Sequence, residues 1–261
     1  MSRRQLTFEC EGARLVGTLD EGSASTGLLI VTGGNEIRSG AFSGQSRLAA
    51  RIALQGYPVF RFDRRGIGDS EGENGEFRSS APDIAAALAA FREAAPHVVR
   101  VVGFGNCDAA SALMLAKGGG LDALALSNPW TFDHVEAEGS EAPPEVVRDH
   151  YRRRLADPAA IRRLLTGQVS IRKLAGSLIA ALRPAAPPSS LVQDITEGIL
   201  GFSGEVRFLI AERDRTAQAF LSHWDKANPR IVRCAGASHA YVEPQASEWL
   251  DRQILEMLQA G

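Results

Sequence analysis

The sequence predicts an α/β fold with a mostly parallel central sheet that is flanked by helices and carries a helical cap insertion. Short apolar runs rich in Val, Ile, Leu and Phe recur along the chain, which is typical of strands covered on both faces. Helical patterns lie between these runs, and such alternation favours a parallel sheet with right-handed crossovers. One long middle segment breaks the alternation. We therefore assign residues 1–127 and 204–261 to the core and residues 128–203 to the insertion.

Eight segments have the pattern of strands. Residues 5–19 predict two short strands on either side of Gly12. Most of the later segments are short and apolar, as expected for strands of a parallel sheet. These six segments are residues 27–32, 57–63, 98–103, 121–127, 205–211 and 230–234.

Four helices are predicted within the core. Residues 44–56 carry an apolar stripe and end at Gly56, which suits a helix C-cap. Residues 79–96 begin with two serines and stop at a proline. Residues 108–117 follow a glycine turn, and residues 244–260 form the last helical pattern.

The insertion is helical in pattern and rich in basic residues. The motif AAPPSS breaks it before one more helical stretch. Two interpretations of the basic residues stay open: a solvated helix face, or a surface that faces an anionic substrate or carrier. The basic residues are Arg148, Arg152, Arg153, Arg154, Arg162, Arg163, Arg172, Lys173 and Arg183.

Composition excludes several classes of function. A formal net charge of -2 gives no overall attraction to nucleic acid, and no run approaches the ~18 apolar residues of a membrane span. The start MSRRQLTFECEG lacks the apolar stretch of a secretory signal. Cys10, Cys107 and Cys234 are widely spaced, which fits reduced thiols in a cytoplasm, and no Cys and His pairing has zinc-ligand spacing.

The segment GFGNCDAAS, residues 103–111, has the outline of a strand, a tight turn and a helix. A nucleophile on such a turn needs small residues two positions before and two after it, because larger side chains would collide with the adjoining strand and helix. Gly105 and Ala109 meet this requirement around Cys107. A thiolate is intrinsically nucleophilic, and a helix N-terminus lowers the pKa of a thiol.

Two other interpretations of this turn stay open. Asp108 could be the nucleophile, as in dehalogenase-like hydrolases, but Asn106 is then a poor fit at the position two before it. Alternatively, Cys107 could simply be a small buried residue.

The partners of Cys107 are sought later in the chain, because strand–turn–helix sites of this kind order their triad as nucleophile, acid and histidine. Of the five histidines, His239 lies in a loop between the last strand and the last helix. Asp214 follows the preceding strand and is the predicted acid, ahead of Glu212, which lies nearer the strand end. Asp214 could instead be the N-cap of the helical stretch RTAQAFL.

An oxyanion hole needs two backbone N–H groups. One is expected from Asp108, directly after the nucleophile. The other is expected from the loop GGNEIRSG, residues 33–40, where the sequence leaves open whether Gly34 or Asn35 donates. Without the rest of the site, this loop would be a plain glycine turn.

Taken together, these segments resemble the α/β-hydrolase superfamily over nearly the whole chain. The stretch FDRRGIGDSEG, residues 62–72, is similar to the D-x-R-G-x-G-x-S motif that follows the fourth strand in many members. Within it, we expect structural roles for Asp63, Arg65, Gly66, Gly68 and Ser70.

More narrowly, GGNEIRSGAF, RFDRRGIGDSEG and the cysteine turn resemble the hydrolases found with exosortase A systems in bacteria. That resemblance implies a context of protein sorting and exopolysaccharide genes more than a substrate. The chain departs from the broader pattern at three places. Cys107 stands where the pattern has Ser, Ala109 stands where it has the last Gly of the nucleophile turn, and no His precedes Gly33.

The sequence thus predicts a hydrolase of ester or thioester acyl groups with the triad Cys107, Asp214 and His239 and no cofactor or metal. Its expected partners are a small-molecule or carrier-bound acyl substrate, without nucleic acid. An acyltransferase with the same triad, or a binding module with a degenerate site, are the alternatives. The sequence leaves the oligomeric state open.

Overall fold

The structure, a computed structural model, describes residues 2–132 and 190–260. Its strands form a single eight-stranded sheet in the order β1-β2-β4-β3-β5-β6-β7-β8. The strands are β1 (Arg3–Cys10), β2 (Ala13–Asp20), β3 (Thr26–Val31), β4 (Val59–Phe62), β5 (Arg100–Asn106), β6 (Ala123–Ser127), β7 (Glu205–Ala211) and β8 (Ile231–Cys234).

The sheet is parallel except at one edge. β1 and β2 form an antiparallel hairpin, and β2 also runs antiparallel to β4. Every later neighbour, from β4 and β3 through to β7 and β8, is parallel. The hairpin turns at Glu11 and Gly12, which have φ angles of 51° and 81°. The mostly parallel sheet that the sequence predicts is therefore confirmed.

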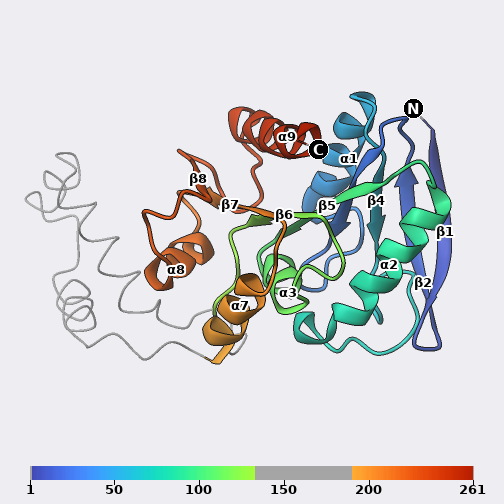
Figure 1. Cartoon of the computed structure of the whole chain (residues 1–261), viewed down its shortest axis with the longest axis horizontal. Coiled ribbons are helices and arrows are strands. Elements are labelled where there is room, and N and C mark those ends of the chain that lie inside the picture. The colour runs from blue at the N-terminus through green and yellow to red at the C-terminus, as the bar shows by residue number, and fades with distance from the viewer. Residues whose placement is uncertain (1, 133–189, 261) are drawn as a thin grey trace, which may run out of the picture.

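Helices cover both faces of the sheet (Figure 1). One face packs against α1 (Gly44–Leu54) and α9 (Pro244–Gln259). The helices on the other face are α2 (Ala81–Ala94), α3 (Asp108–Leu115), α7 (Ser190–Leu200) and α8 (Arg215–His223).

Burial on both faces explains why the strands are apolar throughout. In β3, Leu29 and Val31 belong to the core under α2 and α3, while Leu28 and Ile30 belong to the core under α1 and α9. All four side chains are fully buried. Each such side chain contributes roughly 1.5–3 kcal/mol by leaving water.

The predicted elements agree with the observed ones to within a few residues, with one instructive exception. The predicted strand 98–103 continues to Asn106, because Gly105 and Asn106 pair with Leu126 and Ser127 of β6. Inside the strand, a Cβ at Gly103 would lie 2.5 Å from Leu121 Cδ1, and that side chain would have to shift. Glycine marks a close approach here rather than the end of a strand.

Most of the predicted insertion, together with its basic residues from Arg148 to Arg183, lies outside the described residues. The described part begins again at α7, which packs closely on α3. A Cβ at Gly198 would lie 2.0 Å from the Met114 carbonyl oxygen, so only glycine allows this approach. Among the helices of the described ranges, none is long and apolar enough to cross a membrane.

Candidate active site

Cys107 occupies the sharp turn between β5 and α3, with φ 64° and ψ −127°. This backbone conformation is strained for a residue with a side chain and persists only where the surroundings fix it. The Cys107 N–H donates to the Ser127 carbonyl at 2.9 Å, and its carbonyl accepts from Ala110 N at 3.1 Å and Trp130 N at 3.2 Å. Hydrogen bonds to both the N–H and the carbonyl of Cys107 therefore fix the turn.

The steric requirement predicted for this turn is present in the structure. A Cβ at Gly105 would lie 2.7 Å from the backbone carbon and oxygen of Ala109. Cys107 stands at the tip of the turn, whereas Asp108 is already the first residue of α3. Cys107, rather than Asp108, thus has the backbone geometry of an exposed nucleophile.

The structure brings His239 and Asp214 together with Cys107. Nδ1 of His239 lies 2.9 Å from Oδ2 of Asp214, and His239 lines the same cavity as Cys107, where its ring lowers the pKa of the thiol. Glu212 contacts α8 through its backbone carbonyl, which accepts from Gln218 Nε2 at 3.0 Å. Of the two acids that the sequence offers, Asp214 is the one that reaches the histidine.

Both sequence interpretations of Asp214 hold at once. Its carboxylate accepts from the backbone N–H groups of Thr216 at 3.3 Å and Ala217 at 3.1 Å, which makes it the N-cap of α8. The carboxylate is 8% exposed, so these bonds and the ring of His239 replace water around it.

The surroundings of the triad favour the state in which both His239 and Cys107 carry their protons. The Asp214 hydrogen bond, followed by that of Cys107, raises the pKa of His239 to about 10. Burial raises the pKa of the Cys107 thiol, and the hydrogen bond from His239 opposes that rise. Because both shifts are upward, the pair has to lose one proton before a thiolate can face an imidazolium.

The loop after β3 reaches the turn through Gly34, which has φ 52°. The Gly34 N–H faces the Asp108 carboxylate and donates to its two oxygens at 2.9 and 2.7 Å. Asn35, the other predicted donor, turns its side chain toward Asn74, whose Nδ2 donates to Asn35 Oδ1 at 2.8 Å. The backbone of Gly34 and the start of α3 are thus adjacent, as an oxyanion hole requires.

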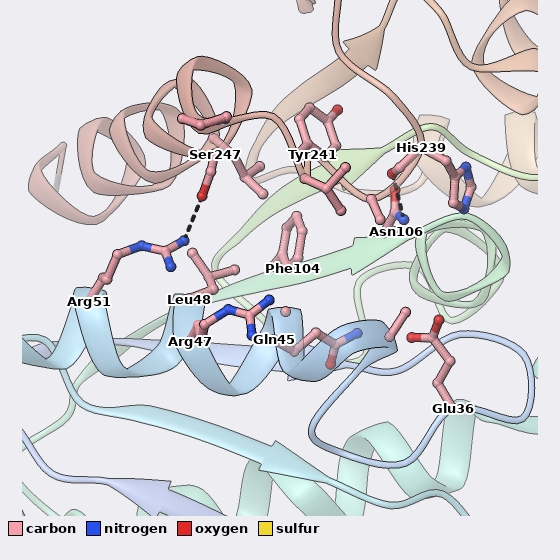
Figure 2. Close-up of a pocket in the computed structure, with 16 residues that line it drawn as sticks. Glu36, Gln45, Arg47, Leu48, Arg51, Phe104, Asn106, His239, Tyr241 and Ser247 are labelled. Carbon is pink, nitrogen blue, oxygen red and sulfur yellow. Dashed lines mark hydrogen bonds between the residues drawn. The ribbon is translucent and has the colours of Figure 1, made fainter.

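Two cavities meet at the triad. The first has a volume of about 250 Å³, and Cys107 lines it. The second, of about 320 Å³, lies between α1 and α9, as Figure 2 shows. Glu36, Gln45, Asn106 and His239 line both, so the two cavities adjoin. The first cavity is lined by Gly33, Gly34, Glu36, Gln45, Phe77, Asn106, Cys107, Asp108, Trp130 and His239.

Two asparagines, Asn106 and Asn128, support the site, and the sequence pattern did not predict this role. Asn106 Nδ2 donates to the His239 carbonyl at 3.2 Å, and Asn106 Oδ1 accepts from Asn128 Nδ2 at 3.0 Å. Asn128 Oδ1 in turn accepts from Ala211 N at 2.8 Å, near the start of the loop that holds Asp214. The one available signal was the position of each Asn at the end of a strand.

The motif after β4 has a structural role, in agreement with the sequence interpretation. Ser70 Oγ donates to the Asp63 carbonyl at 2.7 Å and accepts from Val16 N at 2.9 Å. The buried Asp63 carboxylate accepts from Asp69 N at 3.1 Å and pairs with Arg38. These bonds brace the loop against the oxyanion loop and do not enter the cavity.

All three cysteines are free, and Cys107 alone is not buried. Cys10 donates its thiol proton to Asp83 at 3.4 Å. Within residues 2–132 and 190–260, no group of three or more His, Cys, Asp or Glu side chains could hold a metal ion.

No family model matches this chain, and no curated protein matches it by sequence. Solved structures do. An esterase of Pyrococcus furiosus, Pf2001, has a TM-score of 0.63 at 14% identity, with 99% of this chain and 91% of that chain covered. The α/β hydrolase GrgF of Penicillium sp. sh18 has a TM-score of 0.63 at 18% identity, with 99% and 98% covered. Est1E of Butyrivibrio proteoclasticus, solved with ferulic acid bound, has a TM-score of 0.60 at 15% identity, with 96% and 98% covered.

The chain has the α/β-hydrolase fold. In this fold the nucleophile stands on a strand-to-helix turn and is followed along the chain by the acid and then the histidine. Cys107, Asp214 and His239 occur in that order and converge beside one cavity. Identities this low establish the fold, and the chemistry has to be argued from the site itself.

Proposed function

We propose that this protein hydrolyses ester or thioester acyl groups through a thioester formed on Cys107. The observation that carries the proposal is that Cys107 and His239 line one cavity of about 250 Å³, with His239 paired to Asp214 at 2.9 Å. Nucleophile, base and orienting acid in this relation are the parts that acyl transfer needs.

In the acylation step, the Cys107 thiolate attacks the carbonyl carbon of the substrate while His239 carries the proton. The carbonyl oxygen becomes an oxyanion that the backbone N–H groups of Asp108 and of the loop at Gly34 and Asn35 stabilise. Collapse of this intermediate breaks the bond to the leaving group, which takes the proton from His239. The acyl group remains on sulfur as a thioester.

In the deacylation step, His239 takes a proton from water, which attacks the thioester carbonyl. A second oxyanion forms and collapses, the carboxylic acid leaves, and the proton returns to restore the thiol. Asp214 keeps Nδ1 of the ring as the proton-bearing nitrogen, so that Nε2 faces the reaction. Every step uses groups of this chain alone and calls for no metal or cofactor.

A sulfur nucleophile favours activated acyl donors such as thioesters or reactive esters over plain amides. The two adjoining cavities accommodate a small acyl donor or the acyl end of a carrier-bound one. We further propose a cytoplasmic location, which the three free cysteines support, and a link to polysaccharide export, which the resemblance to exosortase-associated hydrolases supports.

An acyltransferase is the second candidate, and the second cavity favours it. This cavity of about 320 Å³ shares His239 with the first and could hold an alcohol or thiol acceptor in place of water. Product analysis with and without an added acceptor separates the two functions.

The test combines labelling and turnover. We expect a thiol-directed probe to modify Cys107, and Cys107→Ala to abolish both labelling there and hydrolysis of p-nitrophenyl acetate and acetyl thioesters. Peptide mass spectrometry follows Cys10 and Cys234 in the same sample as internal controls, because both are buried. Hydrolysis that survives in Cys107→Ala would refute the proposed function.

A further inference from the structure

The side chain of Asp108 occupies the oxyanion hole of the resting protein. Its carboxylate accepts from the Gly34 N–H with both oxygens, at 2.9 and 2.7 Å. The Gly34 N–H is one of the donors that the proposed reaction assigns to the substrate oxyanion. A carboxylate oxygen therefore stands where the negatively charged oxygen of the tetrahedral intermediate has to form.

The surrounding backbone is shaped to admit this carboxylate. A Cβ at Gly33 would lie 2.3 Å from Asp108 Oδ1, so the glycine leaves room for the carboxylate in this position. The contact joins residues 74 positions apart in the chain. The carboxylate is thus held by the fold and not by its own helix alone.

A buried arginine lies behind the same loop. Arg64 is 3% exposed, donates through Nη1 to Ser80 Oγ at 2.8 Å and donates through Nη2 to the Gly34 carbonyl. The Arg64 charge lowers the pKa of Asp108, against the burial that raises it. Among the described residues, Arg64 Nε has no hydrogen-bond partner, so it remains free to receive a carboxylate that leaves Gly34.

Within the described part of the chain, the charged groups at this end of the site are two carboxylates, an arginine and the protonated form of a histidine. Glu36 lines the cavity with Asp108, while Arg64 lies behind the loop and His239 forms the opposite wall. The Asp108 charge also raises the pKa of the Cys107 thiol. Negative charge at Asp108 thus opposes both the thiolate and the oxyanion that follows it.

We propose that Asp108 is a specificity-determining residue, whose carboxylate must leave the oxyanion donors before a substrate can react and which selects acyl groups without negative charge near the carbonyl. This inference rests on the proposed function. A neutral acyl group can displace the carboxylate toward Arg64, whereas an anionic acyl group would meet Asp108 and Glu36 at short range. The substrate class is therefore a neutral or cationic acyl ester or thioester.

The test compares two p-nitrophenyl esters of four-carbon acids, the neutral butyrate and the anionic hemisuccinate, on wild type and Asp108→Asn. The amide has the same shape and keeps an oxygen for Gly34 but carries no charge. We expect wild type to prefer butyrate, and Asp108→Asn to reduce this preference at least about tenfold and to raise kcat/KM for both esters. Glu248→Gln removes a charge from the exposed face of α9 and is the matched control, in which neither value should change.

A second readout does not depend on ester hydrolysis. The rate of Cys107 alkylation by iodoacetamide, measured against pH, should move to lower pH in Asp108→Asn and in Asp108→Ala, because a like charge is removed. A wild type that hydrolyses both esters while Asp108→Asn leaves the ratio and the alkylation curve unchanged would overturn this inference and leave the proposed function standing. Absence of Cys107-dependent hydrolysis in every variant would overturn both.

Discussion

Asp214 Oδ2 lies 2.9 Å from Nδ1 of His239, and the same carboxylate caps helix α8. One side chain thus links the stability of a helix to the orientation of a proposed catalytic ring. The two roles need different chemistry, since a cap needs an oxygen acceptor and the ring needs a negative charge. This difference allows them to be separated by substitution.

Asp214→Asn should separate them. Asparagine is as good an N-cap as aspartate, so Asp214→Asn should keep the cap of α8 and lose only the stability that the charged pair with His239 contributes. The rate constant kcat should fall by roughly 10⁴-fold, because the amide no longer holds the reactive tautomer of His239. Asp214→Ala should lose activity to a similar degree and about 1 kcal/mol more stability than Asp214→Asn, because it also loses the cap. Urea unfolding and aryl ester turnover measure the two effects, and equal stability losses in both variants would contradict the assignment.

The stability of the protein should depend on pH through His239. Its pKa is raised to about 10 in the folded protein from an ordinary value of 6.5, chiefly by the Asp214 hydrogen bond. A raised pKa stabilises the folded state fully below pH 6.5, and this contribution is lost as the pH rises through about 10. The free energy of unfolding of wild type relative to His239→Gln should therefore shrink over this interval. A difference that stays constant from pH 6 to pH 10 in urea titrations would show that the pair makes no such contribution.

The same histidine should control the reactivity of the Cys107 thiol. The hydrogen bond from His239 lowers the pKa of this thiol against the effect of burial. His239→Gln should therefore move the alkylation of Cys107 by iodoacetamide to higher pH. His223→Gln, on the exposed end of α8, is the control and should leave the curve in place.

Gly105→Ala should damage the turn that carries Cys107. The added Cβ would lie 2.7 Å from the Ala109 backbone, and crowding of this kind costs about 1–3 kcal/mol. Because α3 has to shift to relieve it, ester hydrolysis should fall together with the melting temperature. Gly44→Ala is the control, since its φ of −60° is helical and a Cβ there has nothing within 4 Å. If Gly105→Ala melts and reacts like wild type, the turn is looser than its geometry indicates.

Under native conditions, one of the three thiols should react with a soluble thiol reagent. Cys107 is partly exposed, while Cys10 and Cys234 are buried and burial raises the pKa of both. Thiol titration should give one equivalent for the folded protein and three in denaturant. Two or three fast equivalents without denaturant would contradict the burial of the other cysteines.

The order of elements could be predicted from the sequence because each depends on neighbours a few residues away. Buried strands such as Glu205–Ala211 appear at their predicted bounds, since a short apolar run has few other ways to bury both faces. Where prediction stopped short, as at Gly105 and Asn106, the strand continues because β6 supplies partners that local pattern does not show.

By itself, the sequence determined the alternating sheet and helices, the small residues around Cys107 and the order of Cys107, Asp214 and His239, because these follow from local periodicity and from the steric demands of one turn. Only the tertiary structure decided that Asp214 serves both α8 and His239, and that the Asp108 carboxylate lies on the Gly34 N–H. Such contacts join distant parts of the chain, and the packing of the whole sheet sets their geometry. The orientation of a short polar side chain depends on partners that are distant in the sequence, so the local sequence pattern does not predict it.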